Sequence, residues 1–398
     1  MEQWKEYKYS ELATIISGGT PKTAIQEYWN GNIPWLSVKD FGNDDKYVYT
    51  TEKSITELGL NNSPTNLLKH DDIIISARGT VGELSMIPFP MSFNQSCFGI
   101  RAKEHVNPHF LYYLTKTKIR ELKNNSHGSV FDTITRATFE SIICNVPNLD
   151  EQKRIAYFLS SLDDKIELNR RINDNLEQQA QALFKSWFVD FEPFKDGEFV
   201  DSELGMIPKG WRVGKLCDIA DITMGQSPSG DSYNENGIGE IFYQGRTEFG
   251  YRYPTIRLYT TAPNRMAETN SILLSVRAPV GDINVSLQKC CIGRGLASIN
   301  AIDNYYSFVF YTIKSMKRNF DVYNGEGTVF GSINKDSLNN MSVIIPTDDI
   351  KSNFENIVSK LDNEYRLNHN EIVNLSNLRD TLLPRLMSGE LKINNLNC

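Results

Sequence analysis

The sequence predicts an α+β protein in which two homologous domains are joined by two long helices that form an antiparallel coiled coil. Three observations lead to this prediction. The chain has 398 residues, which is too many for one ordinary core. Several segments recur in the same order about 199 residues further along. Each copy is followed by a heptad pattern of apolar residues.

The composition is typical of a globular protein, with 40% hydrophobic and 23% charged residues. The first residues, MEQWKEYKYS, lack the regions of a signal peptide, and no apolar run reaches the roughly 18 residues of a membrane helix. The six cysteines show no C-x-x-C spacing, which predicts reduced thiols in a cytoplasmic protein. The net charge is −7, but the acidic excess lies mainly in 150–200 and 347–398, so both domains could carry basic faces.

The internal repeat is carried by short segments that match at a nearly constant offset. These segments are IIISARGTVGEL at 73–84 and ILLSVRAPVGDI at 272–283, GSVFDTITRATF at 128–139 and GTVFGSINKDSL at 327–338, and IISGGTP at 15–21 and ITMGQSP at 222–228. The stretches near 43–70 and 251–269 do not align. The pattern predicts a shared frame with divergent loops.

The elements follow in the same order in each copy. Short β-branched runs such as SILLSV predict strands, and the glycines and prolines between them predict turns. The segment PHFLYYLTKTKIREL predicts a short helix. These elements predict one mixed domain over residues 1–149 and a second over 196–347. The long helices are predicted at 150–195 and 348–392.

The two long helices share an apolar stripe with steps of four and three residues. In the first helix the stripe extends from Ile155 to Trp187, and in the second from Phe354 to Leu386. Neither helix can bury this seam alone, so each is expected to pair with the other. The heptad leaves the direction open, and a twofold repeat favours the antiparallel arrangement.

Asparagines interrupt the stripe at the equivalent positions Asn169 and Asn368. A buried asparagine selects one register when a partner amide lies opposite. We therefore expect Asn169 and Asn368 to face each other and set the coiled-coil register. The alternative is that both lie at the edge of the seam, in water. Asn173 has no counterpart, because Ile372 occupies that phase, and it is expected at the surface.

Motifs that resemble catalytic sites are incomplete. NIPW at 32–35 departs at Ile33 from the N-P-P-[FYW] loop of amino-methyltransferases, and no glycine-rich loop follows a strand. GQSPSGDS at 225–232 has the spacing of a P-loop, but Asp231 stands where the phosphate-binding lysine is required. The histidines lack an accompanying set of metal ligands. The sequence therefore predicts a binding protein with no catalytic residues and no metal site.

Candidate DNA-binding residues come from basic and small polar loops. In the second copy, arginines alternate with tyrosines in YQGRTEFGYRYPTIRLYTTAPNR, a pattern that suits phosphates and base edges, although a solvated loop remains the alternative. Arg78 and Arg277 follow equivalent strands and either contact phosphate or hold a turn. The candidates are Thr20, Lys22, Arg78, Ser129, Arg136, Ser227, Arg246, Arg252, Arg257, Arg277, Thr328 and Lys335.

The whole chain resembles the specificity subunit of type I restriction–modification enzymes. The resemblance is carried by PNLDEQKRIAYFLSSLDDKIELNRRINDNLEQQAQALFKSWFVDFEP in the first long helix, by LRDTLLPRLMSGEL in the second, and by GGTP, GQSP and PWLSVKDFG near the domain starts. It implies that 1–149 and 196–347 are target recognition domains, each reading one half of a bipartite asymmetric DNA site. The helices at 150–195 and 348–392 would form the coiled coil that spaces them.

The resemblance also implies partners. The coiled coil would dock two adenine methyltransferase subunits, and restriction subunits with helicase and nuclease activity would join them. S-adenosylmethionine, ATP and Mg²⁺ would belong to those partner subunits, and this chain would have no cofactor and no catalytic role. Two other classes remain open at this point: a standalone DNA-modifying enzyme with unrecognised motifs, and a coiled-coil scaffold protein.

Overall fold

The computed structural model folds as two compact units. The described residues are 4–42, 45–124, 133–325 and 331–393. The first unit combines residues 1–171 with 368–398, and the second contains 172–367. Each long helix therefore contributes one stretch to each unit. No helix in the described part of the chain has both the length and the apolar character of a membrane span.

The first unit contains two four-stranded sheets. One has the order β2-β9-β6-β7 and is antiparallel throughout. The other has the order β4-β3-β8-β5, in which β3 and β8 run parallel. A separate pair, β1-β10, joins the start of the domain to its end. The strands are β1 (Lys5–Lys8), β2 (Ala13–Ser17), β3 (Trp29–Leu36), β4 (Lys53–Ile55), β5 (Leu67–Leu68), β6 (Ile73–Ser76), β7 (Leu84–Met86), β8 (Met91–Phe93), β9 (Cys97–Ala102) and β10 (Ile143–Val146).

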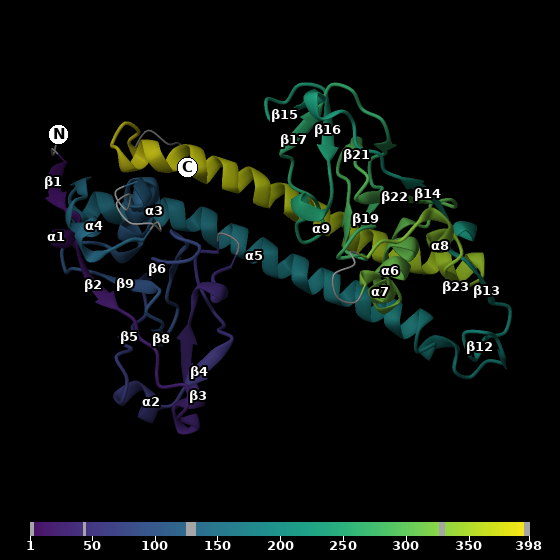
Figure 1. Cartoon of the computed structure of the whole chain (residues 1–398), viewed down its shortest axis with the longest axis horizontal. Coiled ribbons are helices and arrows are strands. Elements are labelled where there is room, and N and C mark those ends of the chain that lie inside the picture. The colour runs from purple at the N-terminus through teal and green to yellow at the C-terminus, as the bar shows by residue number, and fades with distance from the viewer. Residues whose placement is uncertain (1–3, 43–44, 125–132, 326–330, 394–398) are drawn as a thin grey trace. The chain divides into compact units, whose positions relative to one another are not determined.

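Helices close the core of the first unit. They are α1 (Tyr9–Leu12), α2 (Glu57–Asn61), α3 (Pro108–Asn124) and α4 (Arg136–Glu140), with 3-10 turns at Gln26–Tyr28 and Val38–Asp40. Figure 1 shows α3 beside α5 (Leu149–Phe188), and Phe110 and Leu159 from these helices belong to one buried cluster. Leu386 of α9 (Asp348–Met387) lies in the same cluster. The long helices are thus part of the domain core.

The second unit repeats this architecture. Its antiparallel sheet has the order β14-β22-β19-β20, and its second sheet has the order β15-β17-β16-β21-β18 with β16 parallel to β21. The pair β13-β23 takes the place of β1-β10, and β11-β12 forms a small hairpin. The strands are β11 (Phe199–Val200), β12 (Ile207–Pro208), β13 (Arg212–Lys215), β14 (Ala220–Met224), β15 (Tyr233–Asn234), β16 (Glu240–Tyr243), β17 (Leu258–Thr260), β18 (Met266–Ala267), β19 (Ile272–Ser275), β20 (Ile283–Val285), β21 (Cys290–Ile292), β22 (Leu296–Ala301) and β23 (Ser342–Ile345). The predicted duplication is therefore present in the fold.

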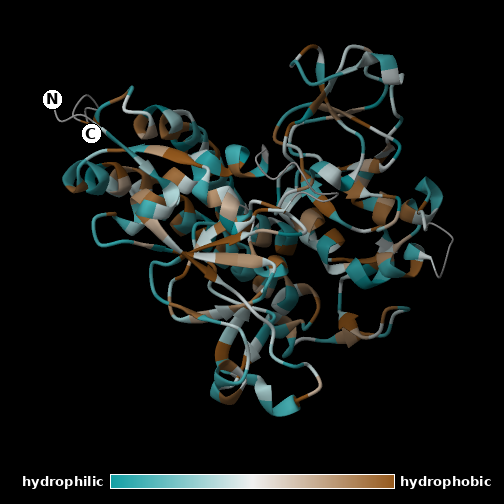
Figure 2. Ribbon diagram, turned by 60° about the vertical axis from the view of Figure 1, so that its left-hand side comes forward, coloured by the Kyte–Doolittle hydropathy of each residue, from teal (hydrophilic) through white to brown (hydrophobic). Residues whose placement is uncertain are grey.

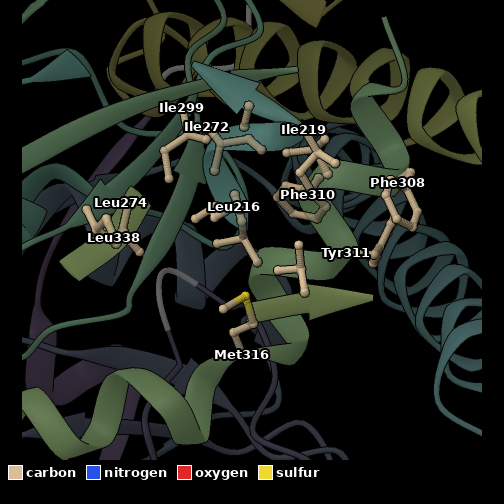
Figure 3. Close-up of a cluster of buried hydrophobic side chains, with 14 of the residues drawn as sticks. Leu216, Ile219, Ile272, Leu274, Ile299, Phe308, Phe310, Tyr311, Met316 and Leu338 are labelled. Atoms are coloured by element: carbon tan, nitrogen blue, oxygen red, sulfur yellow. The ribbon is translucent and has the colours of Figure 1, made fainter. Parts of the chain in front are cut away.

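The core of the second unit lies between the β14-β22-β19-β20 sheet and its helices. The helices are α6 (Tyr306–Ser315), α7 (Lys317–Asp321) and α8 (Lys335–Asn339), with 3-10 turns at Glu192–Phe194, Leu216–Asp218, Gly230–Ser232, Arg246–Glu248 and Val322–Asn324. Ile272 and Ile299 pair across β19 and β22 and belong to one buried cluster with Phe308 of α6 (Figure 3). Figure 2 shows hydrophobic residues gathered on interior strands, whereas the surface loops are mostly hydrophilic.

The long helices α5 and α9 each contain 40 residues and pair in antiparallel fashion within each unit. The contacting pairs, in order along α5, are Asp163–Arg379, Asn169–Glu371, Asn173–Tyr365 and Phe184–Phe354. Residue numbers on α9 fall as those on α5 rise, so the predicted antiparallel coil is confirmed. The helices predicted at 150–195 and 348–392 are both too long, because α5 ends at Phe188 and α9 ends at Met387. After α5, Phe191 adopts a left-handed conformation with φ 55°.

The seam asparagines are buried, but their partners differ from the prediction. Asn169 is 0% exposed and Asn368 is 7% exposed, so the water-edge alternative is wrong. The side-chain nitrogen of Asn169 donates to Glu371 Oε2 over 2.7 Å instead of binding Asn368. Glu371 and Asn368 are separated by nearly one turn of α9, so the stagger of the helices moves the equivalent positions apart. Asn173, expected at the surface, is 4% exposed and donates to the carbonyl of Tyr365 over 3.2 Å.

Candidate nucleic-acid interface

In the first unit, four loops lie together at the ends of strands from the two sheets. They are 18–22 after β2, 37–40 after β3, 77–82 after β6, and 94–96 between β8 and β9. We call these loops the first rim. In an antiparallel sheet, the ends of β2 and β6 lie at the same edge as the start of β9, so the topology itself brings three of the loops together.

Backbone hydrogen bonds tie the loops of the first rim to one another. The amide of Gly19 donates to Phe93 over 2.9 Å, the amide of Asn94 donates to Leu36 over 2.9 Å, and Ala77 donates to Ser96 over 2.7 Å. The close approach of the loop after β2 to the loop between β8 and β9 also requires a glycine at position 18. A Cβ atom at Gly18 would lie 2.0 Å from the carbonyl oxygen of Asn94.

The side chains of the first rim surround a cavity of about 360 Å³. Its lining includes Trp35, Lys39, Lys53, Arg78 and Asn94. Lys39, Lys53 and Arg78 are exposed, and none of them forms an ion pair within the described part of the chain. The cavity therefore combines an aromatic ring with positive charge and amide groups, the residue types that contact phosphates and base edges.

Two acidic residues, Asp40 and Glu52, line this cavity; Glu52 is exposed, whereas Asp40 holds the loop. Asp40 accepts from the amide and hydroxyl of Ser37 over 2.7 and 2.8 Å, and from the amide of Glu52 over 2.7 Å. The indole of Trp35 donates to the carbonyl of Gly19 over 3.0 Å. The carboxylate of Asp40 is thus engaged by neighbouring groups, whereas Lys39, Lys53 and Arg78 remain exposed at the cavity.

The second unit has an equivalent rim, formed by loops 225–229, 245–248, 276–281 and 293–295. The amide of Gly225 donates to Leu296 over 2.9 Å, and that of Gly293 donates to Tyr243 over 2.8 Å. A Cβ atom at Gly225 would lie 2.2 Å from the carbonyl oxygen of Gly293, as at Gly18 in the first unit. The amide of Arg294 donates to the hydroxyl of Ser227 over 3.2 Å. The second rim thus has the same backbone frame with different side chains.

Most of the predicted DNA-binding residues lie on or beside the two rims. On the first rim, Thr20 binds Gln95, and Arg136 donates to Ser17 Oγ over 3.0 Å next to the loop after β2. The remaining rim residues are Lys22 and Arg78 in the first unit and Ser227, Arg246 and Arg277 in the second. Lys335 is exposed at the start of α8, close to Ile333, whose amide donates to Val276 of the rim. Ser129 and Thr328 lie outside the described residues.

Arg246 and Arg257 are exposed but already paired with carboxylates. Arg246 contacts Asp282, which also lies 2.9 Å from the amine of Lys317. Burial acts to raise the pKa of Asp282, but the hydrogen bonds from Lys317 and Arg246 outweigh it and hold the pKa below its ordinary value. Arg257 donates to Glu248 over 2.6 Å. A phosphate would have to compete with these carboxylates for either guanidinium.

The prediction that Arg252 contacts DNA is wrong for this structure. Its side chain is only 6% exposed, and its guanidinium binds Asp362 and Glu177 on the long helices. The loop before β17 turns inward at this point, so that the arginine lies against the rings of Phe310 and Tyr365. In the sequence, the alternation of arginines with tyrosines indicated a basic surface. In the structure, Arg252 makes a buried contact instead.

Several rim residues were missed at the level of sequence. The motifs in the sequence did not identify Lys39, Asn94 and Gln95 in the first rim, or Arg294 in the second. Gln95 and Arg294 lie 199 residues apart, between β8 and β9 and between β21 and β22, and both are exposed. The repeat offset was the signal that could have located them, because it marks equivalent loops whose residue types differ.

Comparison with known proteins agrees with this architecture. The chain matches the family model described as the type I restriction modification DNA specificity domain over residues 1–178 and again over 208–377. It is similar to the type I restriction enzyme MjaIX specificity subunit of Methanocaldococcus jannaschii, at 31% identity over 99% of this chain and 95% of that protein. The HindI specificity subunit of Haemophilus influenzae is 24% identical over 98% of this chain and 100% of its own length.

A solved structure shares the fold. It is the S subunit of the type I restriction–modification system from M. genitalium, with a TM-score of 0.59 and 17% identity over 97% of this chain and 96% of that one. The relatives do not support a standalone enzyme or an unrelated scaffold. The two family matches coincide with the two repeats, and together they cover most of the chain. This protein therefore belongs to the family of type I restriction–modification DNA specificity subunits.

Proposed function

We propose that this specificity subunit reads a bipartite, asymmetric DNA site, with one rim on each half-site. The observation that supports the proposal is a common loop frame carrying unlike side chains. At equivalent positions the first rim has Lys39 and Gln95, whereas the second has Thr247 and Arg294. Different donors and acceptors at the same place would select different bases, because each base pair presents its own pattern in the major groove.

The side chains that the two rims share have a different proposed role. Arg78 and Arg277 follow equivalent strands β6 and β19 and are both exposed. A residue that is the same on both rims carries no information about two unlike half-sites. We assign both arginines to the phosphate backbone, where they would position each domain on the duplex.

The partner subunits belong to the same proposal. Exposed leucines recur on the long helices, with Leu168 at 51% and Leu367 at 61% exposure, and such apolar positions suit protein contacts. We propose that the helix pair docks two adenine methyltransferase subunits, and that restriction subunits join them. S-adenosylmethionine, ATP and Mg²⁺ would be bound by those partners, while this chain supplies recognition.

The test is to express the full chain with its methyltransferase partner and to map methylated adenines across a genome. Gln95→Ala should relax one base position in one half-site, and Arg294→Ala should relax one position in the other half-site. Each loss is expected to be about 1–3 kcal/mol against the preferred base. Arg78→Ala should instead weaken methylation at all sites alike.

Lys195→Ala provides the matched control, since this lysine is exposed in the turn after α5 and pairs only with Glu192 in the described structure. The control should leave the methylated motif unchanged. If neither Gln95→Ala nor Arg294→Ala alters the motif in folded protein, the assignment of reading to the rims is refuted.

A further inference from the structure

In the second unit, the buried guanidinium of Arg252 joins the recognition domain to both long helices. Its Nη2 donates to Asp362 Oδ1 of α9 over 2.6 Å, and its Nη1 lies 3.2 Å from Glu177 Oε2 of α5. All three residues belong to the same compact unit. One side chain from the loop before β17 therefore binds two helices at once. We call Arg252, Glu177 and Asp362 the second anchor.

Aromatic rings and hydroxyl groups hold the second anchor in one geometry. The guanidinium carbon lies 4.4 Å from the ring centroid of Phe310 and 4.9 Å from that of Tyr365. The hydroxyls of Ser307 and Tyr311 donate to Asp362 over 2.6 and 3.0 Å. Both oxygens of Asp362 are thereby hydrogen-bonded, so the carboxylate has little freedom to turn.

The first unit places Lys46 where the second places Arg252. The backbone carbonyl of Lys46 accepts from the amide of Met86 over 2.6 Å, and that of Arg252 accepts from the amide of Val285 over 2.8 Å. Met86 and Val285 end the equivalent strands β7 and β20. Lys46 is 8% exposed, and its amine donates to Ser160 of α5 over 2.8 Å.

The buried carboxylate is repeated as well. The hydroxyl of Tyr113 donates to Asp163 over 2.5 Å, in the same way as Tyr311 donates to Asp362. Arg379 of α9 supplies the cation that pairs with Asp163, at 2.8 Å. In the first anchor, Lys46 and Tyr113 therefore bind α5 through Ser160 and Asp163, and the Asp163–Arg379 pair continues the contact to α9.

Stability alone does not account for these anchors. Taking charges out of water costs more than most buried ion pairs return, and apolar side chains of similar size would often be as stable. Burial lowers the pKa of Lys46, although Asp163 and Asp164 oppose the effect. What a satisfied buried pair provides is a single allowed arrangement, because any other leaves a charge without a partner.

We infer that Lys46 and Arg252 are positioning residues that hold each recognition domain at one orientation on its stretch of the helix pair. The inference rests on the proposed function of the rims. A change of orientation displaces the rim along the DNA, and a displacement of roughly 3.4 Å corresponds to one base pair. The anchors therefore restrict the enzyme to one gap length between the half-sites, without contributing to the choice of bases.

The experiment uses the full chain assembled with its methyltransferase partner and duplexes that contain the methylated motif. The gap between the half-sites is kept, shortened by one base pair or lengthened by one, and kcat/KM for methylation is measured on each duplex. Arg252→Met should lower the preference for the native gap over its neighbours by about tenfold, with the same bases selected in each half-site. Arg252→Lys should restore much of the preference, since a lysine can still reach one carboxylate.

Arg212→Met is the matched control, because Arg212 is an exposed arginine of the same unit that pairs with Asp218. It should keep the native gap preference. Should Arg252→Met fail to fold, Asp362→Asn serves instead, since it keeps the size and the acceptor oxygen but removes the charge. An unchanged gap preference in the folded Arg252→Met or Asp362→Asn enzyme overturns the inference. A wild-type motif without two half-sites would instead overturn the proposed function.

Discussion

Asn169 shows what one polar residue does inside an apolar seam. Its nitrogen donates to Glu371, but its oxygen is buried and has no hydrogen-bond partner within the described residues. A buried polar atom without a partner costs about 1–3 kcal/mol. The asparagine is therefore present at a cost in stability, as expected of a residue that selects one register rather than strengthens the helix pair.

Asn169→Leu should raise the free energy of unfolding by about 1 kcal/mol, because it removes the unpaired oxygen. Glu371 can compensate for the lost bond through Lys165, 3.2 Å away, and through water. Urea unfolding measures the change, and disulfide cross-linking across the seam reports whether a second register appears. Asn175→Leu, at an exposed position of α5, is the control. A loss of stability in Asn169→Leu would mean that the bond to Glu371 outweighs the orphaned oxygen.

His109 gives a second prediction at the residue scale. Burial and the nearby Lys46 lower its pKa, although Asp71, 3.6 Å away, opposes them. The folded protein therefore resists protonation more than the unfolded chain does, so stability is full above the ordinary histidine pKa of about 6.5 and falls as the pH drops through the lowered value. The melting temperature should fall between pH 7 and pH 5, and His109→Ser should flatten that fall.

Serine is chosen to replace His109 because Ser307 occupies the position in the second unit that is equivalent to His109. His70→Ser is the control, since the His70 side chain is 67% exposed. An equal pH dependence in wild type and His109→Ser would show that another group is responsible.

At the scale of the elements, each long helix belongs to two cores. The buried cluster of the first unit includes Leu159 of α5 and Leu386 of α9, and that of the second includes Phe184 and Phe354 of the same two helices. Neither domain has a complete core without both helices. The helix pair is therefore a structural part of each recognition domain as well as the connection between them.

Phe354→Ala should lower the free energy of unfolding by about 3–5 kcal/mol, the usual range for a fully buried phenylalanine. Its ring lies 5.0 Å from that of Phe188 and 5.9 Å from that of Phe184, and the residue is 0% exposed. Chemical denaturation measures the loss. Ile357→Ala on the same helix is the control, because Ile357 is 46% exposed and should cost far less. Equal losses for both would contradict the described core.

At the scale of the whole molecule, an acidic chain has to bind a polyanion. The net charge is −7, so long-range electrostatics oppose association and the local cations of the rims must dominate at contact. Affinity for DNA should therefore fall steeply with salt, by counterion release. The rims, rather than the overall charge, determine where DNA can lie.

Lys39→Ala should reduce the slope of log affinity against log salt by about 0.9, the value for one phosphate contact. Filter binding of the assembled methyltransferase at several salt concentrations measures it. Lys195→Ala, in the turn after α5, should leave the slope unchanged. An unchanged slope in Lys39→Ala would remove this lysine from the phosphate contacts.

The sequence by itself determined the duplication, the two long helices and the family, because these depend on periodicities and offsets that are local or regular along the chain; it favoured the antiparallel pairing, which the contacts between α5 and α9 established. It also located Arg78 and Arg277 on equivalent loops. Only the tertiary structure decided that Arg252 is buried, that Lys46 is its counterpart and that Asn169 binds Glu371. These outcomes depend on how a divergent loop turns toward the helices and on how far the helices are staggered, and both are set by contacts between residues that are far apart in the sequence, such as Arg252 with Asp362 and Asn169 with Glu371.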